Sequence, residues 1–229
     1  PQAALAQISL PRMAEDMQES WLAEIMDAAA SVFAEAGASI AGGHSTLGAE
    51  LVIGFTVTGL LDDPPLTLAG AKEEDALILT RPIGTGTVLA GEMEGLAKGD
   101  DVHSMLQAMA RLQGDAANCL STQAHAMTDV TGFGLGGHLA RMAEASGLSA
   151  EIKLQAVPIY TGAMALAEAG IRSTIWAGNR AAVSATVPQT AKGALLFDPH
   201  TAGGLLAALP AAKADQCLAE LRAMGHEAA

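Results

Sequence analysis

Aromatic residues make up 3% of this 229-residue chain, and it holds two cysteines. An aromatic-rich core is therefore excluded, and the core must be built mainly from Ala, Leu, Val, Ile and Met. Cys119 and Cys217 form neither a CxxC pair nor zinc-ligand spacing, and the six histidines show no HExxH arrangement. We therefore expect two unpaired thiols in a cytoplasmic protein, where thiols rarely pair. No apolar run is long enough to span a bilayer, and no signal peptide is recognisable.

Positive charge is also scarce, with 12 Lys and Arg residues against 25 Asp and Glu residues and a net charge of −13. This balance argues against a broad nucleic-acid surface, which needs a basic footprint. It argues equally against binding to an anionic membrane. ATP binding stays open, because local loops and metal ions can supply the positive field. The chain also lacks a serine nucleophile elbow.

Half of the residues are hydrophobic, so the chain can bury a sizeable core. Periodicity predicts an α+β fold in two lobes, residues 1–65 and 66–229, joined at the turn Asp62-Asp63-Pro64-Pro65. In the first lobe we expect strands and one helix whose apolar face carries Trp21, Ile25, Ala29 and Val32. The expected elements are strands Ala3–Leu10, Ser39–Ala41 and Leu51–Leu60 and helix Asp16–Ala36. In the second lobe they are strands Ala76–Thr80, Ala150–Leu154, Leu195–Phe197 and Leu205–Leu209, with helices ending at Glu94 and over Asp101–Thr122, Leu135–Ala145, Thr161–Ala169 and Ala211–Met224.

The most informative segment runs from Met127 to His138 and places Asp129 in a glycine-rich turn that opens into a helix. Glycines allow a close approach of the backbone to a bound group, and a helix N-terminus favours anions. A carboxylate there could hold Mg²⁺ together with phosphates and waters. The alternative is an ordinary strand–turn–helix junction with Asp129 in a capping role.

Three other segments are candidates with simpler alternatives. Gly42-Gly43-His44-Ser45 could cradle a nucleotide, although Gly-Gly is also a common hairpin turn. Thr80–Gly86 resembles a phosphate loop but lacks the Gly-Lys-Ser/Thr ending, which favours helix capping. In the segment Asp198–Gly204, we expect Asp198 to stabilise its own turn, and we assign no catalytic role to it or to His200.

Taken together and in order, these motifs resemble selenophosphate synthetase (selenide, water dikinase), a member of the aminoimidazole ribonucleotide synthetase-like ATP-binding superfamily. The resemblance covers nearly the whole chain, and the Asp129 and Asp198 segments are its most specific parts. It rests on the segments Ala41–Ser45, Glu50–Gly54 with Val57–Gly59, Leu79–Gly86, Met127–Gly134 and Asp198–Leu206.

The resemblance implies a two-lobed α+β enzyme that forms a homodimer through its N-terminal lobe. Such an enzyme uses ATP, Mg²⁺ and a reduced selenium donor to make selenophosphate, AMP and phosphate. Asp129 matches the family's metal-binding aspartate in the C-terminal lobe. Gly43, His44 and Ser45 match an ATP-contacting turn. The chemistry is phosphoryl transfer, in which positioning and metal charge carry most of the catalysis.

This sequence departs from the family pattern at its beginning. The family's catalytic Cys or selenocysteine and its Lys would lie upstream of Pro1, so no residue of this chain is assigned as catalytic. We therefore expect the 229-residue chain alone to be inactive and to bind ATP weakly or not at all. Arg81 replaces Lys, His200 replaces Gln, and Ala202 replaces Ser. The alternatives are another ATP-dependent small-molecule kinase or ligase of the superfamily, or a non-catalytic dimerisation module.

Overall fold

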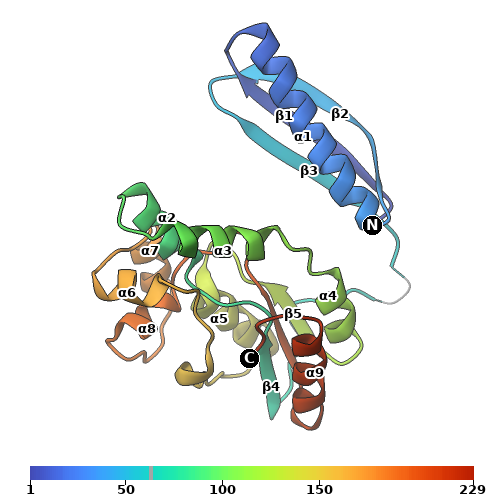
Figure 1. Ribbon diagram of the computed structural model, residues 1–229. Coiled ribbons are helices and arrows are strands. Elements are labelled where there is room, and N and C mark those ends of the chain that lie inside the picture. The colour runs from blue at the N-terminus through green and yellow to red at the C-terminus, as the bar shows by residue number, and fades with distance from the viewer. Residues whose placement is uncertain (62–63) are drawn as a thin grey trace. The chain divides into compact units, whose positions relative to one another are not determined.

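The computed structural model describes residues 1–61 and 64–229 (Figure 1). Its contacts divide the chain into two compact units, Pro1–Pro65 and Leu66–Ala229. The first unit combines one helix with a three-stranded sheet, and the second combines several helices with another, so the predicted α+β class is confirmed. The expected linker at 62–65 includes residues 62 and 63, which lie outside the described residues. None of the described helices has the length and apolar character needed to cross a membrane.

The first unit is a three-stranded sheet with one helix on it. Strand β1 is central, paired in parallel with β2 and antiparallel with β3. The helix α1 connects β1 to β2 and packs on alternate residues of β1, namely Ala6, Ile8 and Leu10. The elements are β1 Ala3–Pro11, α1 Glu15–Glu35, β2 Ser39–Gly48 and β3 Val52–Thr58.

The face that α1 presents to the sheet agrees only in part with the expected one, since Ile25 belongs to both. Leu22, Ile25 and Met26 pack against the sheet, whereas Trp21 and Val32 are exposed. The apolar stripe is thus rotated by one residue. Farther along α1, Phe33 lies against Phe55 of β3, with ring centres 5.2 Å apart.

The second unit is built on a sheet whose order is β4-β6-β5, with β6 antiparallel to both neighbours. Helix α5 covers one face and helices α4 and α9 cover the other. Alternate residues of β6 serve the two faces, because Leu206 and Ala208 pack toward α5 while Ala207 and Leu209 pack toward α4 and α9. The strands are β4 Asp75–Leu79, β5 Ala126–Asp129 and β6 Leu205–Pro210, and the covering helices are α4 Gly114–Ser121, α5 Gly134–Ser146 and α9 Ala211–Ala223.

Helices α2, α3 and α6 pack around Val88, Met105 and Leu166, whereas η1, α7 and α8 contribute Leu154, Trp176 and Leu195 to the core beside α5. Helix α6 contacts both α2 and α8, and α2 contacts α3. These elements are α2 Thr85–Met93, α3 Gly99–Ala110, η1 Leu154–Ala156, α6 Ala163–Glu168, α7 Trp176–Ala181 and α8 Ala191–Leu195.

Three expectations about the second unit are wrong. Residues 150–154 form no strand, since Ile152 only packs on the core before a short 3₁₀ turn. Leu195 ends helix α8, and Leu196 and Phe197 follow as a buried turn rather than a strand. The single helix expected over Asp101–Thr122 is two helices, α3 and α4. The backbone of Arg111 is extended, which ends α3. Residues in the resulting break take part in the site described below.

Candidate functional site

Three loops meet at one end of the second unit's sheet. Because β6 is antiparallel to β4 and β5, its beginning lies at the same end as their ends. Hydrogen bonds join the loops: Val130 N–H donates to the carbonyl of Gly204 at 2.8 Å, and His200 N–H to that of Thr131 at 3.0 Å. We call residues 80–84, 130–133 and 198–204 the three-loop cluster. Three of the four segments singled out in the sequence contribute to it.

Asp129 is the last residue of β5 and stands at the edge of this cluster. Its side chain is exposed, and among the described residues its carboxylate has no hydrogen-bond or ion-pair partner. The next residue, Val130, is 1% exposed and anchors the turn in the core. The site therefore presents a free carboxylate on a fixed backbone.

The turn after Asp129 is held by His138 of helix α5. Thr131 N–H donates to His138 Nε2 at 3.0 Å, which requires that nitrogen to carry no proton. Burial lowers the pKa of His138, although the nearby Asp129 opposes the effect. A neutral imidazole thus fixes the turn, and His138 acts here as a structural residue.

The glycines of the cluster let the loops pack against one another. Gly134 has φ of +72°, and a Cβ there would lie 2.8 Å from the carbonyl oxygens of Leu196 and Asp198. A Cβ on Gly203 would lie 2.0 Å from the carbonyl oxygen of Val130. Gly132 differs, because a Cβ there would meet nothing within 4 Å. At Gly134 and Gly203 the closely approaching group is therefore another loop's backbone rather than a ligand.

Asp198 reaches the first turn of helix α2 instead of its own turn, so the expected local role is wrong. Its fully buried carboxylate accepts hydrogen bonds from Thr87 N–H at 3.0 Å and from Thr87 Oγ1 at 2.7 Å. Burial raises its pKa to about 6, while the bonds from Thr87 act in the opposite direction. Asp198 thereby ties the loop before β6 to the helix after β4.

His200 is a buried part of the same junction. Its Nδ1 lies 3.2 Å from Thr85 Oγ1, and its Nε2 is buried with no hydrogen-bond partner in the described structure. Burial lowers the pKa of His200 to about 3, so the ring is neutral. The ring is 5% exposed and packs inside the junction between the loop 198–204 and helix α2.

Arg81 is also structural in this unit. Its guanidinium is buried and donates to the carbonyl oxygens of Ala202, at 2.7 Å, and Arg111. Gln113 lies in the break between α3 and α4, where it accepts from Thr80 Oγ1 at 2.8 Å and donates to the Gly203 carbonyl at 2.9 Å. The break thus frees backbone and side-chain groups that hold two of the three loops, which explains why a single long helix does not form.

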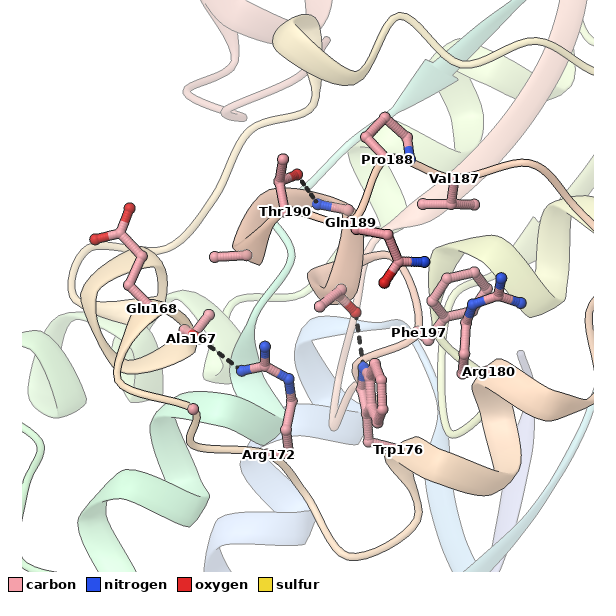
Figure 2. A pocket seen from close by; sticks show the side chains of 14 residues that line it. Ala167, Glu168, Arg172, Trp176, Arg180, Val187, Pro188, Gln189, Thr190 and Phe197 are labelled. Atoms are coloured by element: carbon pink, nitrogen blue, oxygen red, sulfur yellow. Dashed lines mark hydrogen bonds between the residues drawn. The ribbon is translucent and has the colours of Figure 1, made fainter.

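A pocket of about 450 Å³ is lined in part by Phe197, the residue directly before the loop 198–204 (Figure 2). The guanidinium carbon of Arg172 lies 5.5 Å from the ring centre of Trp176, and that of Arg180 lies 5.0 Å from the ring centre of Phe197. Next to Arg180 in the chain, the buried Asn179 donates to the carbonyls of Gly132 at 2.8 Å and Phe197 at 3.1 Å. Asn179 therefore couples the pocket wall to the Asp129 turn.

Sequence reasoning missed helix α7 and this role of Asn179. The helix is six residues long, and only part of it is apolar, so periodicity offers little signal. An Asn placed directly before an Arg carries no local motif. Its function becomes visible only when two loops distant in sequence are brought to its side chain.

The remaining predicted site residues, Gly43, His44 and Ser45, belong to the first unit. They lie within strand β2, so the expected turn is wrong. A Cβ on Gly43 would lie 2.1 Å from the carbonyl oxygen of Ala6, and this close approach of β1 requires glycine. His44 pairs with Gln7, which places it on the sheet face opposite α1, and its side chain is exposed.

The donor set around Asp129 fits one kind of metal ion. Within residues 1–61 and 64–229, no group of three or more His, Cys, Asp or Glu side chains gathers as a ready-made metal site. A single exposed carboxylate suits Mg²⁺, which binds through one or two carboxylates while phosphates and waters complete its shell. It does not suit zinc, which takes three or four protein ligands.

The two units and their loops match a known class of protein. The N-terminal domain of AIR synthase related protein matches residues 1–61, and its C-terminal domain matches residues 72–229. The second match covers more than half of the chain, so this chain belongs to the AIR synthase related family. Within that family, the resemblance to selenide, water dikinases is confirmed.

The selenide, water dikinase of Pelobacter propionicus is 36% identical over 237 residues, covering 100% of this chain and 67% of that protein. Further proteins with this name match at 34–39% identity. The chain spans 56–67% of the length of these relatives.

Solved structures of proteins with other names share the fold. The thiamine-monophosphate kinase of Stenotrophomonas maltophilia K279a superimposes with a TM-score of 0.70 at 18% identity, covering 100% of this chain and 67% of that one. The hydrogenase maturation protein HypE, solved in complex with ATP, gives a TM-score of 0.62 at 19% identity, covering 97% and 61%. At such identities these two structures support the fold alone.

Proposed function

We propose that this chain is part of a selenide, water dikinase that transfers phosphate from ATP to a reduced selenium donor. The products are selenophosphate, AMP and phosphate. One observation carries the proposal: an unpartnered Asp129 carboxylate stands at the three-loop cluster of a chain 36% identical to a protein of that name. The sequence motifs that carry the resemblance are also those that build the cluster.

Asp129 is the residue that would hold Mg²⁺ in this proposal. Its exposed carboxylate can contribute one ligand, while nucleotide phosphates and waters fill the others. When bound, the ion would neutralise charge on the phosphates during transfer. Val130, Thr131 and His138 keep the carboxylate in place, because they fix the backbone directly after it.

Gly43, His44 and Ser45 are proposed to contact ATP. His44 lies on the sheet face that α1 leaves uncovered, where an imidazole can donate to a phosphate or ribose oxygen. The same face carries Leu5, which is 51% exposed, and Val52, which is 59% exposed. Exposed apolar side chains on an open sheet favour a partner, and we propose that a second copy of the chain covers them in a homodimer.

We also propose that the protein is cytoplasmic. The 229-residue chain alone is proposed to be inactive. A single carboxylate holds a metal ion weakly unless other ligands join it, and the described residues offer no further cluster of metal ligands. The alternative function is phosphorylation of a different small molecule. The observation that favours this alternative is the fold shared with a thiamine-monophosphate kinase.

The test measures both AMP and ADP formation by the full-length gene product and, in parallel, by the 229-residue chain. Selenide-dependent turnover releases AMP, whereas simple phosphorylation of a competing acceptor by ATP releases ADP. Each is supplied with ATP, Mg²⁺ and selenide, or with thiamine monophosphate as the competing acceptor. The proposal expects AMP release from the full-length protein only with selenide. We expect Asp129→Asn to lower this rate by about 100-fold, by comparison with losses at metal sites. The control variant Asp215→Asn changes an exposed aspartate on α9 and should leave the rate unchanged.

Three outcomes would contradict parts of the proposal. Turnover with thiamine monophosphate and none with selenide would establish the alternative kinase. An unchanged rate in Asp129→Asn would remove Asp129 from the metal site. Full activity of the 229-residue chain would refute its proposed inactivity, while the function itself would stand.

A further inference from the structure

Cys119 and Cys217 lie side by side in the folded chain, although 98 positions separate them in sequence. Their Sγ atoms are 3.6 Å apart, one on helix α4 and the other on helix α9. Both helices cover the same face of the sheet, and Cys217 packs in the core cluster with Leu120 and Leu221. The chain holds no other cysteine. The fold has thus brought its two thiols into contact.

The surroundings of the pair allow access from one side. Cys217 is 3% exposed, whereas Cys119 is partly exposed and can meet a small reagent. A disulfide has an S–S length of about 2.0 Å, so the sulfur atoms need to approach by about 1.6 Å. Side-chain rotation and a small shift of α4 against α9 can supply a displacement of that size.

We propose that Cys119 and Cys217 are a reversible oxidation site. The two residues form a disulfide with each other, and a small-molecule disulfide such as oxidised glutathione is the oxidant. This inference does not depend on the proposed function. The two cysteines lie on α4 and α9, and neither residue takes part in the proposed Mg²⁺ or ATP contacts.

The exchange proceeds in two balanced steps. The Cys119 thiolate attacks one sulfur of oxidised glutathione, forms a mixed disulfide and releases one glutathione thiolate, which takes up a proton. The Cys217 thiolate then attacks Cys119 Sγ, which breaks the mixed disulfide and releases the second glutathione. The protein loses two hydrogens, and the glutathione disulfide is reduced to two thiols.

The rate of the first step should rise with pH. Burial raises the pKa of Cys119 to about 12, with Cys217 and Glu220 adding to the effect, so little thiolate exists near neutrality. The titratable groups that face Cys119 in the described structure are these two side chains of α9, with Glu220 Oε2 at 3.6 Å. The pair is therefore a slow, stable site rather than a rapid sensor.

The disulfide would join two helices that connect to the three-loop cluster. Helix α4 begins directly after Gln113, whose side chain binds Thr80 and Gly203. Cross-linking residues so far apart in sequence restricts the unfolded chain strongly. We expect the oxidised protein to melt roughly 5–15 °C above the reduced protein.

The experiment treats the folded chain with excess oxidised glutathione at mildly alkaline pH and follows intact mass. The expected product is the monomer lighter by two hydrogens, with a Cys119–Cys217 linked peptide after digestion and full reversal by a reductant. Cys217→Ala should instead stop at one glutathione bound to Cys119. If the variant fails to fold, the mass and the linked peptide of the wild-type product still test the proposal.

Two results would overturn the proposal. One is a wild-type product that carries glutathione on Cys119 and never loses it in favour of the internal bond. The other is an unreacted or intermolecularly linked wild-type chain under conditions that fully oxidise an unfolded sample of the same protein.

Discussion

Replacing Asp198 by Asn should change how the stability of the second unit depends on pH. The carboxylate is fully buried, and burial raises its pKa from 3.8 to about 6, against the hydrogen bonds from Thr87. The folded state therefore favours the protonated form. The stability that this preference supplies is complete below about pH 4 and is lost as the pH rises through about 6.

The size of the effect follows from the pKa difference. A shift from 3.8 to about 6 corresponds to about 3 kcal/mol at 1.36 kcal/mol for each unit. The free energy of unfolding of the wild type relative to Asp198→Asn should therefore fall by about 3 kcal/mol between about pH 4 and 7. Loss of a hydrogen bond from Thr87 adds an offset that is the same at both pH values.

The assay is denaturant unfolding followed by tryptophan fluorescence. Trp176 lies in the second unit and Trp21 in the first, so a Trp21→Phe background makes the signal report on the second unit alone. Asp215→Asn on α9 is the control, since that side chain is exposed. A stability difference between wild type and Asp198→Asn that stays constant over this pH range would refute the reasoning.

Two further predictions concern the loop packing and the open sheet. Gly134→Ala should lower stability by about 2–4 kcal/mol, because both the positive φ and the contacts at 2.8 Å oppose a Cβ. Gly147→Ala has similar φ but meets nothing within 4 Å, so it should lose only about 1 kcal/mol, and equal losses in thermal unfolding would contradict the packing argument. Leu5→Asp should convert a homodimer to monomers in sedimentation velocity, whereas Met17→Asp on α1 should not.

Much of the secondary structure could be predicted from local pattern. Helix α5 begins and ends as predicted within a residue or two, because Gly147 adopts the left-handed conformation at its C-terminus. The inner strand β6 was predicted from its apolar run, and α9 from its periodicity. These predictions are correct because the signals that define each element, its apolar pattern or its terminal glycine, lie within the segment itself.

The failures arise where distant residues decide the structure. The apolar run Leu195–Phe197 has the composition of a strand, but the three-residue run is too short to distinguish a strand from a buried turn. The break near Gln113 depends on Thr80 and Gly203, which a local reading cannot place beside it. The contact of Cys119 with Cys217 is equally non-local, so sequence spacing alone predicted only two free thiols.

The sequence motifs predicted which segments come together better than they predicted what each side chain contacts. Three of the four segments meet in one cluster, yet Asp198 joins two loops instead of stabilising its own turn, and Arg81 holds loop carbonyls. At the edge of that cluster, Asp129 keeps an exposed carboxylate that has no hydrogen-bond or ion-pair partner among the described residues. The roles of Asp129 and of His44 in binding Mg²⁺ and ATP stay predictions.

The most direct test of the central claim is ³¹P NMR of the reaction of the full-length protein with ATP, Mg²⁺ and selenide. The account predicts a selenophosphate resonance that shows coupling to selenium, that depends on added selenide, and that is strongly reduced in Asp129→Asn. Nucleotide turnover that yields no phosphorus–selenium product, with the same spectrum in the presence and absence of selenide, would contradict it.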